Sequence, residues 1–335
     1  MKKRVLSLFL VFALSISMMP ATAFAEGTGT VTEQETQSSK DAAGVSDDSN
    51  AGEDISGGNA VNKDAAVEAV QADHTDHPIC GATCNHEDEN GSSTHEDVTW
   101  TAINTADDLP SYKVTSGYYY LTNNITLTDT WSINSGQNIV LCLNGHSITM
   151  NKNTSVITID NSTFTLCDCT GNGEITHGTD GGTKFTGSGV CVGSGTFNMY
   201  GGKITGNTST TSSGGGVSVS QGGKFSMYGG EISGNTSSGD GGGVSLASAG
   251  SFSMYGGEIS GNTSSSSNEG GGGVHVGAGT SFTMEGGTIS GNYATNGAGG
   301  GVYVETYGSG STGTFLMKDG TITDNTANSG GGGVY

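Results

Sequence analysis

The stretch Gly214–Asn235, GGGVSVSQGGKFSMYGGEISGN, is one copy of a unit that returns along the second half of the chain. The next copy begins at Gly241 and reads GGGVSLASAGSFSMYGGEISGN. Further copies begin at Gly187, Gly271 and Gly299, the last with an insertion before its phenylalanine. Self-similarity with a period of about 20–50 residues is typical of solenoids and arrays. The repeat therefore predicts a solenoid built from stacked copies of this unit.

Each copy contains three short segments, V-x-V, F-x-M and I-x-G, in which apolar residues alternate with small ones. A period of two is typical of strands rather than helices. One copy cannot bury its apolar face alone, but stacked copies can, with strands about 4.8 Å apart. The pattern predicts an all-β solenoid, a parallel β-helix, in which Val217, Phe225, Met227 and Ile232 and their equivalents point inward. Asn235 and its equivalents are expected to form a ladder along the turns.

On these repeats the chain resembles the right-handed parallel β-helix of the pectin-lyase-like class, as found in repeat-built proteins of the bacterial cell surface. The resemblance covers roughly residues 117–335, and Ile139–Ile148, IVLCLNGHSI, resembles the opening coils of such proteins. Collagen is excluded because no strict third-residue glycine exists and only 3 Pro are present. A disordered Gly/Ser linker would not keep the apolar residues in a common phase. The sequence stops at Tyr335 within a further copy, so we expect the natural chain to continue.

The N-terminal part is predicted to be a leader and a spacer. Residues 1–25 combine a basic start, an apolar run and the small-residue ending AFA, which predicts a secretory signal peptide rather than a membrane span. Residues 26–72 contain no aromatic residue and are predicted to be a disordered acidic linker. Residues 26–136 hold 20 acidic and three basic residues, so they carry most of the net charge of −21. This acidity argues against a nucleic-acid partner, and the signal peptide predicts an extracellular or cell-surface location.

Residues 73–98 form a Cys/His-rich segment with four of the seven histidines of the chain. Imidazole and thiolate groups at short spacing are zinc ligands. The segment predicts a structural Zn²⁺ site formed by His77, Cys80, Cys84 and His86, the one cofactor that the sequence suggests. The spacing matches no standard zinc finger. In a secreted chain, a Cys80–Cys84 disulfide in a solvated loop is the alternative.

Residues 99–116 are predicted to cap the open strand edge of the solenoid, through Trp100 and one helical turn between Asn104 and Leu109. In the first coils, Cys142 and Cys167 occupy equivalent outward positions. The coil spacing lies within the Cα separation of a disulfide. The six cysteines allow several connectivities, and the sequence leaves the choice open.

Two outward features bear on function. Tyr200, Tyr228 and Tyr255 occupy one repeated position and form a candidate ligand-binding ladder, because stacked aromatic rings on a β surface can bind sugars. Glu231 and Glu258 would stand one coil apart, close to the carboxylate spacing of a retaining glycosidase. They belong to a duplicated motif, however, and no arginine follows Arg4. No residue is therefore assigned a catalytic role.

Three functions remain open at this point. The first is a non-catalytic scaffold or adhesin that contacts extracellular polysaccharide or a host surface. A carbohydrate-binding module is the second, and a polysaccharide-degrading enzyme is the third. Enzymes differentiate their coils, because a site needs different groups converging at one place. These coils stay alike, so we expect the first function, with carbohydrate binding or cleavage as the alternative.

Overall fold

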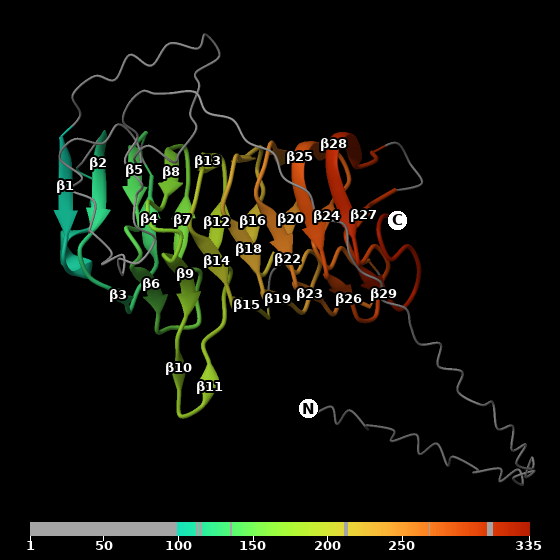
Figure 1. Ribbon diagram of the computed structural model, residues 1–335, viewed down its shortest axis with the longest axis horizontal. Coiled ribbons are helices and arrows are strands. Elements are labelled where there is room, and N and C mark those ends of the chain that lie inside the picture. Colours follow the sequence, from blue (N-terminus) through green and yellow to red (C-terminus); the bar gives the residue numbers. More distant parts are fainter. Residues whose placement is uncertain are drawn as a thin grey trace, which may run out of the picture. The chain divides into compact units, whose positions relative to one another are not determined.

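The computed structural model describes residues 99–335 except 112, 114–115, 135, 211–213, 268 and 307–310. In this part of the chain nearly every strand pairs in parallel with its equivalent in the next coil, so the chain is a parallel β-helix (Figure 1). The signal peptide, the linker and the Cys/His-rich segment predicted for residues 1–98 lie outside the described residues.

The Val strands form a seven-stranded parallel sheet. Its members are β4 (Trp131–Ile133), β7 (Ile157–Ile159), β12 (Val190–Val192), β16 (Val217–Val219), β20 (Val244–Leu246), β24 (Val274–Val276) and β27 (Val302–Val304). Val217 pairs with Val190 on one side and Val244 on the other, so the repeats stack in the register that the sequence predicts.

The Phe strands form the first part of a 15-stranded sheet. They are β1 (Trp100–Ile103), β2 (Ser116–Leu121), β5 (Asn138–Cys142), β8 (Thr163–Cys167), β13 (Thr196–Met199), β17 (Lys224–Met227), β21 (Ser251–Met254), β25 (Ser281–Ser290) and β28 (Thr314–Thr323). Because β1 pairs in parallel with β2, the segment expected to cap the solenoid contributes a strand to this sheet. The helical turn expected there is the short 3-10 helix η2 (Ala106–Asp108).

The Ile strands complete that sheet, since β25 and β28 run through both positions. They are β3 (Ile125–Leu127), β6 (Ser147–Met150), β9 (Glu174–His177), β14 (Lys203–Thr205), β18 (Glu231–Ser233) and β22 (Glu258–Ser260). A glycine pair turns the chain between the Phe and Ile strands. At Gly257 φ is +84°, and a Cβ would lie 2.6 Å from Met227 Cε, so only glycine fits this corner.

Two features were not foreseen in the sequence. A fourth ladder of two-residue strands follows the Ile strands: β15 (Thr208–Ser209), β19 (Thr236–Ser237), β23 (Thr263–Ser264), β26 (Tyr293–Ala294) and β29 (Thr326–Ala327). An antiparallel hairpin, β10 (Thr179–Asp180) and β11 (Thr183–Lys184), projects from an early coil (Figure 1). Gly181 and Gly182 both have positive φ, as a tight two-residue hairpin turn requires.

The core is a set of stacked columns of identical side chains. Phe197, Phe225, Phe252 and Phe282 are buried, and successive ring centroids lie 5.0, 4.6 and 4.6 Å apart. This confirms the predicted Phe column. Full burial of such a side chain contributes about 1.5–3 kcal/mol, so the columns account for much of the stability of each coil.

A ladder of asparagines satisfies the backbone beside this core. Asn262 Nδ2 donates to Asn292 Oδ1 at 2.9 Å and to the carbonyl of Ile232 at 2.8 Å. Its Oδ1 accepts from both the backbone N–H and Nδ2 of Asn235 at 3.0 Å. The same pattern links Asn207 to Asn235 and Asn292 to Asn325, which confirms the predicted Asn ladder.

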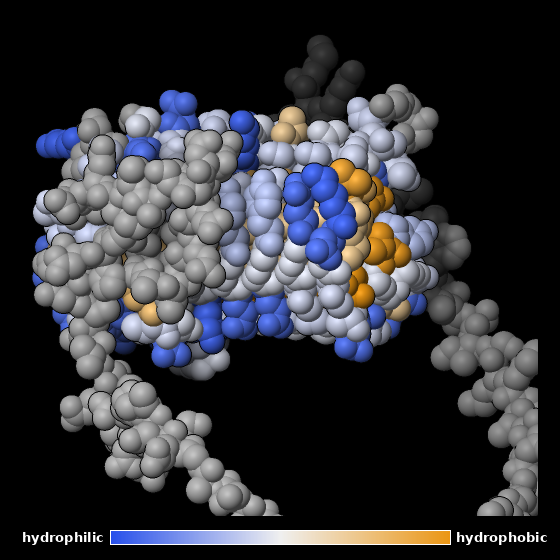
Figure 2. All heavy atoms as spheres, turned by 45° about the horizontal axis from the view of Figure 1, so that its top comes forward, coloured by the Kyte–Doolittle hydropathy of each residue, from blue (hydrophilic) through white to orange (hydrophobic). Residues whose placement is uncertain are grey.

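The surface of the stack is mostly polar, and hydrophobic atoms gather at one end of the face in Figure 2. The last coil, at that end, exposes Leu316, Met317 and Val334 by 49, 42 and 45%. Met317 and Val334 are the register partners of Met284 and Val302, which are buried because a further coil covers them, whereas Leu316 is the partner of the outward Thr283.

Candidate functional site

The three tyrosines predicted as a ladder are brought together. Tyr200, Tyr228 and Tyr255 directly follow the register-matched strands β13, β17 and β21. The rings of Tyr200 and Tyr228 stack at 4.4 Å with an angle of 6°, and those of Tyr228 and Tyr255 at 4.8 Å and 10°. Tyr228 and Tyr255 are exposed, whereas Tyr200 is half-buried and packs against an apolar cluster beneath it.

This stacking limits what the tyrosines can offer a ligand. Rings that lie parallel at these distances cover one another's faces, so Tyr228 has a neighbour on each side. Burial, and then the neighbouring Tyr228 phenol, raises the pKa of Tyr200 to about 12. The ladder therefore presents ring edges and hydroxyl groups, and leaves a ring face without a tyrosine partner only at its ends. Sugar binding at these residues stays a prediction.

Charged pairs flank the tyrosines. Glu231 and Glu258 are register partners on β18 and β22, as predicted, and Lys203 Nζ lies 3.4 Å from Glu231 Oε2. Lys318 Nζ lies 2.9 Å from Glu285 Oε1 near the end of the tyrosine column. The side chains of these pairs are partly exposed, and ion pairs in contact with solvent contribute little to stability.

The outward cysteines of the first coils lie in a small apolar cluster with Trp100 and Val140. Cys142 and Cys167 are register partners, as the alignment predicts. The Sγ atom of Cys142, however, lies 3.0 Å from that of Cys169. The backbone register thus pairs Cys142 with Cys167, whereas the side-chain contact of Cys142 is with Cys169.

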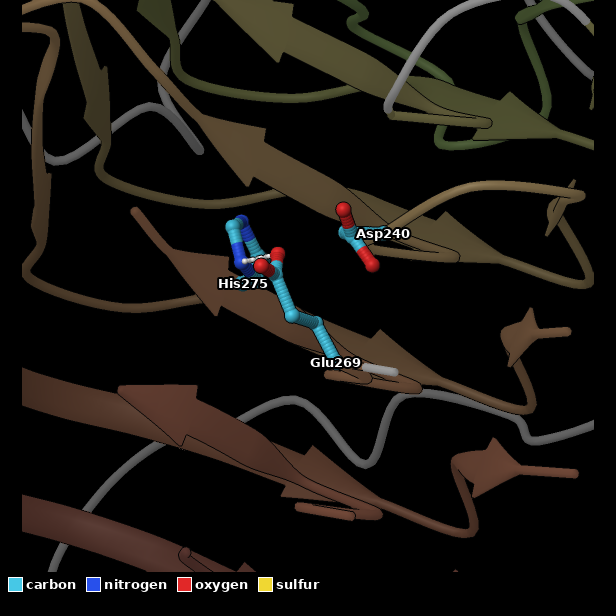
Figure 3. A group of neighbouring side chains, drawn as sticks. All are labelled: Asp240, Glu269 and His275. Carbon is cyan, nitrogen blue, oxygen red and sulfur yellow. Dashed lines mark hydrogen bonds and ion pairs between the residues drawn. The ribbon is translucent and has the colours of Figure 1, made fainter. Parts of the chain in front are cut away.

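A second cluster was not found in the sequence. Asp240 precedes β20, Glu269 precedes β24, and His275 is the central residue of β24. Each offers one oxygen or nitrogen atom, and these atoms all lie within 4.8 Å of one another. His275 Nε2 lies 3.1 Å from Glu269 Oε2, with the Asp240 carboxylate beside the pair (Figure 3). An imidazole with two carboxylates can hold a proton or a metal ion.

Within the cluster His275 is buried, whereas Asp240 and Glu269 are partly exposed. His275 is 5% exposed, and its ring stacks on Tyr303 with centroids 5.6 Å apart. Burial raises the pKa of the Asp240 carboxyl, and the nearby Glu269 adds to that effect. The hydrogen bond with His275 lowers the pKa of Glu269. The two carboxyl groups thus differ in their surroundings although they share one site.

The signal that could have found this cluster is a departure from the repeat. His275 pairs with Ser245 of the preceding coil, which in turn pairs with Ser218. The backbone N–H of Gly214 donates a hydrogen bond to the carbonyl of Asp240. Equivalent bonds run from Gly271 to Ala298 and from Gly299 to Gly330, so Asp240 occupies a position that holds a small residue in other coils. Acidic and imidazole groups replace small ones in two adjacent coils.

The predicted zinc ligands His77, Cys80, Cys84 and His86 lie outside the described residues. Comparison with family models, with curated proteins and with solved structures finds no match for this chain. No helix within the described ranges is long and apolar enough to cross a membrane.

Proposed function

We propose that the chain is a secreted or surface-displayed scaffold or adhesin of a bacterial envelope, built as a right-handed, pectin-lyase-like β-helix. The observation that carries this proposal is the regular stacking of like residues in successive coils. The Phe column and the Asn ladder hold each coil in register with the next. The same outward residue then returns at the same place in the next coil, as Ser226 and Ser253 do on β17 and β21.

Repeated outward chemistry suits repeated contacts. A weak contact made at each of several coils gains affinity from its neighbours, because later contacts form within an already bound complex. A stack with a continuous backbone ladder also separates whatever lies at its two ends by a fixed distance. Both properties fit a protein that holds other molecules at a surface, with polysaccharide or a host surface as the partner.

The signal peptide and the acidic linker support this location. A leader directs the chain out of the cytoplasm, and a solvated acidic segment would extend between the leader and the β-helix. These features rest on the sequence of residues 1–72.

The experiment exposes the full-length secreted protein to acidic and neutral polysaccharides and measures both retention and turnover. We expect retention without release of new chain ends. Turnover that is lost in a Glu231→Gln, Glu258→Gln double variant, and kept in Asp180→Asn on the projecting hairpin, would contradict the proposal and favour an enzyme.

Carbohydrate binding at the tyrosine ladder is the second candidate, and the exposed ring of Tyr255 favours it. Tyr228 covers one face of this ring, whereas the next coil carries Glu285 rather than a further tyrosine. A sugar stacked on Tyr255 would lose its contact in Tyr255→Ala and keep it in Tyr255→Phe. Equal retention by both variants would exclude ring stacking as the mode of binding.

A further inference from the structure

Two adjacent coils converge on the Asp240, Glu269 and His275 cluster. Asp240 comes from the coil of β20, whereas Glu269 and His275 come from the coil of β24. In the outward column that contains His275, the register partners of His275 are Ser245 of the preceding coil and Tyr303 of the following coil. Three groups that can ligate a metal ion therefore meet at one place on the outer surface of the β-helix.

Two polar atoms of this cluster lack a partner. Asp240 Oδ1 and His275 Nδ1 are inaccessible to solvent and make no hydrogen bond within the described residues. Leaving a buried polar atom unpaired is unfavourable, more so when the group is charged. The imidazole side chain itself is only 6% exposed. A partner for the Asp240 oxygen would remove part of that cost.

The charges of the cluster are also unbalanced. With both carboxylates ionised, the two negative charges face at most one positive charge, on a protonated His275. A divalent cation would compensate both carboxylates at once and would take the position of the proton between His275 Nε2 and Glu269.

We propose that Asp240, Glu269 and His275 bind one divalent cation of the zinc type, which links the coils of β20 and β24. Imidazole nitrogen and carboxylate oxygen are both zinc ligands, whereas calcium selects six to eight oxygen ligands. Nε2 of His275 would give up its hydrogen bond to Glu269 and supply its lone pair to the metal, since a ligating histidine must be neutral. Three protein ligands leave a position for water.

The repeat provides substitutions that the fold already accepts. His275→Ser places at this position the residue found in the two preceding coils, and Asp240→Ala reproduces Ala298 of a following coil. Loss of metal binding in these variants would report on the ligands, because neither substitution introduces a side chain that the coil architecture lacks. Glu258→Gln removes a carboxylate on a different strand and serves as the control.

The test measures zinc binding by titration calorimetry on the metal-free full-length protein. Every sample carries Cys80→Ser and Cys84→Ser, which remove two of the predicted zinc ligands of the Cys/His-rich segment, so that a zinc site there does not contribute. In this background we expect one equivalent of zinc and a rise in the thermal transition with added zinc, because a ligand that binds only the folded state stabilises it. Calcium should produce neither effect.

His275→Ser and Asp240→Ala should each weaken zinc binding by more than about tenfold, the loss that follows even from removing an outer partner of a metal ligand. Glu258→Gln should leave the affinity unchanged. The ring nitrogen resonances of His275 should also move on zinc addition. Absence of zinc binding in the protein with Cys80→Ser and Cys84→Ser would overturn the proposal. So would binding of one equivalent of zinc with full affinity by both the His275→Ser and the Asp240→Ala variants.

Discussion

The early and the later coils of the β-helix fill the same interior in different ways. In the later coils Phe225, Phe252 and Phe282 stack at 4.6 Å with ring planes within 6°. In an early coil Trp131 meets Phe164 edge-on, with centroids 5.5 Å apart and an angle of 80°. Identical rings in successive coils can stack face to face, whereas side chains of different size and shape pack in other geometries, such as this edge-on contact.

The polar ladder changes between the same regions. Asn207 begins the series of asparagines, and in the coil before it His177 lies with Nδ1 2.7 Å from Asn207 Oδ1. The second ring nitrogen of His177 is 2.8 Å from the carbonyl oxygen of Thr154. A buried histidine thus takes the end position of the ladder. Repeated residues therefore fix the register of the later coils, whereas the early coils keep the same register with residues that differ from coil to coil.

The largest effect is expected where the uniform column is broken. Phe252→Asp would place a carboxylate between Phe225 and Phe282 without a polar partner, and should lower the free energy of unfolding by about 5 kcal/mol or more. Chemical denaturation measures it. Ser253→Asp, one residue along and outward on β21, is the matched control and should change stability little. Equal effects of the two variants would place Phe252 outside the core.

The next effect concerns the polar ladder. Asn262→Ala would leave the backbone N–H of Asn235 and the carbonyl of Ile232 without their side-chain partners. Each buried group left unpaired costs about 1–3 kcal/mol, so we expect a loss of about 2–4 kcal/mol in the same denaturation experiment. Asn296→Ala removes an exposed asparagine that bonds to Ser265 and should have a much smaller effect. A loss no larger than that of the control would show that the ladder does not stabilise the fold.

The smallest effect is expected at the tyrosine column. Because the pKa of Tyr200 is raised to about 12 in the folded protein, the unfolded chain loses this proton first as the pH rises. The contribution of Tyr200 to stability is therefore complete below about pH 10, the ordinary pKa of tyrosine, and is lost as the pH approaches about 12. Ultraviolet titration should show a late phenolate component that Tyr200→Phe removes. Identical titration curves for the two proteins would contradict the packing of Tyr200.

The sequence predicted the inward columns because residue type and spacing repeat together. Val217, Phe225 and Ile232 could be assigned from their period alone, and the Asn ladder followed from the common phase. The fourth strand of the later coils was missed because Thr208 and Ser209 have the composition of a turn and form a strand only through pairing with Thr236 and Ser237. Local composition carries no information on such pairing.

The two candidate sites also differ in how far the sequence could predict them. The tyrosines repeat, so their proximity could be predicted, whereas the way their rings cover one another could not. Asp240, Glu269 and His275 occur once each and lie in two different coils, so no spacing motif unites them. Their proximity depends on how the loops before β20 and β24 fold against the stack.

The register of the coils can be measured directly by disulfide cross-linking. Ser226 and Ser253 are outward residues that pair on β17 and β21, so Ser226→Cys with Ser253→Cys should cross-link under mild oxidation, as peptide mass spectrometry of the full-length protein would show. Asn198 lies on β13, one coil further away, since it pairs with Ser226. A protein with Asn198→Cys and Ser253→Cys should therefore form no such bond. A cross-link between positions 198 and 253, or none between 226 and 253, would contradict a helix in which each repeat forms one coil.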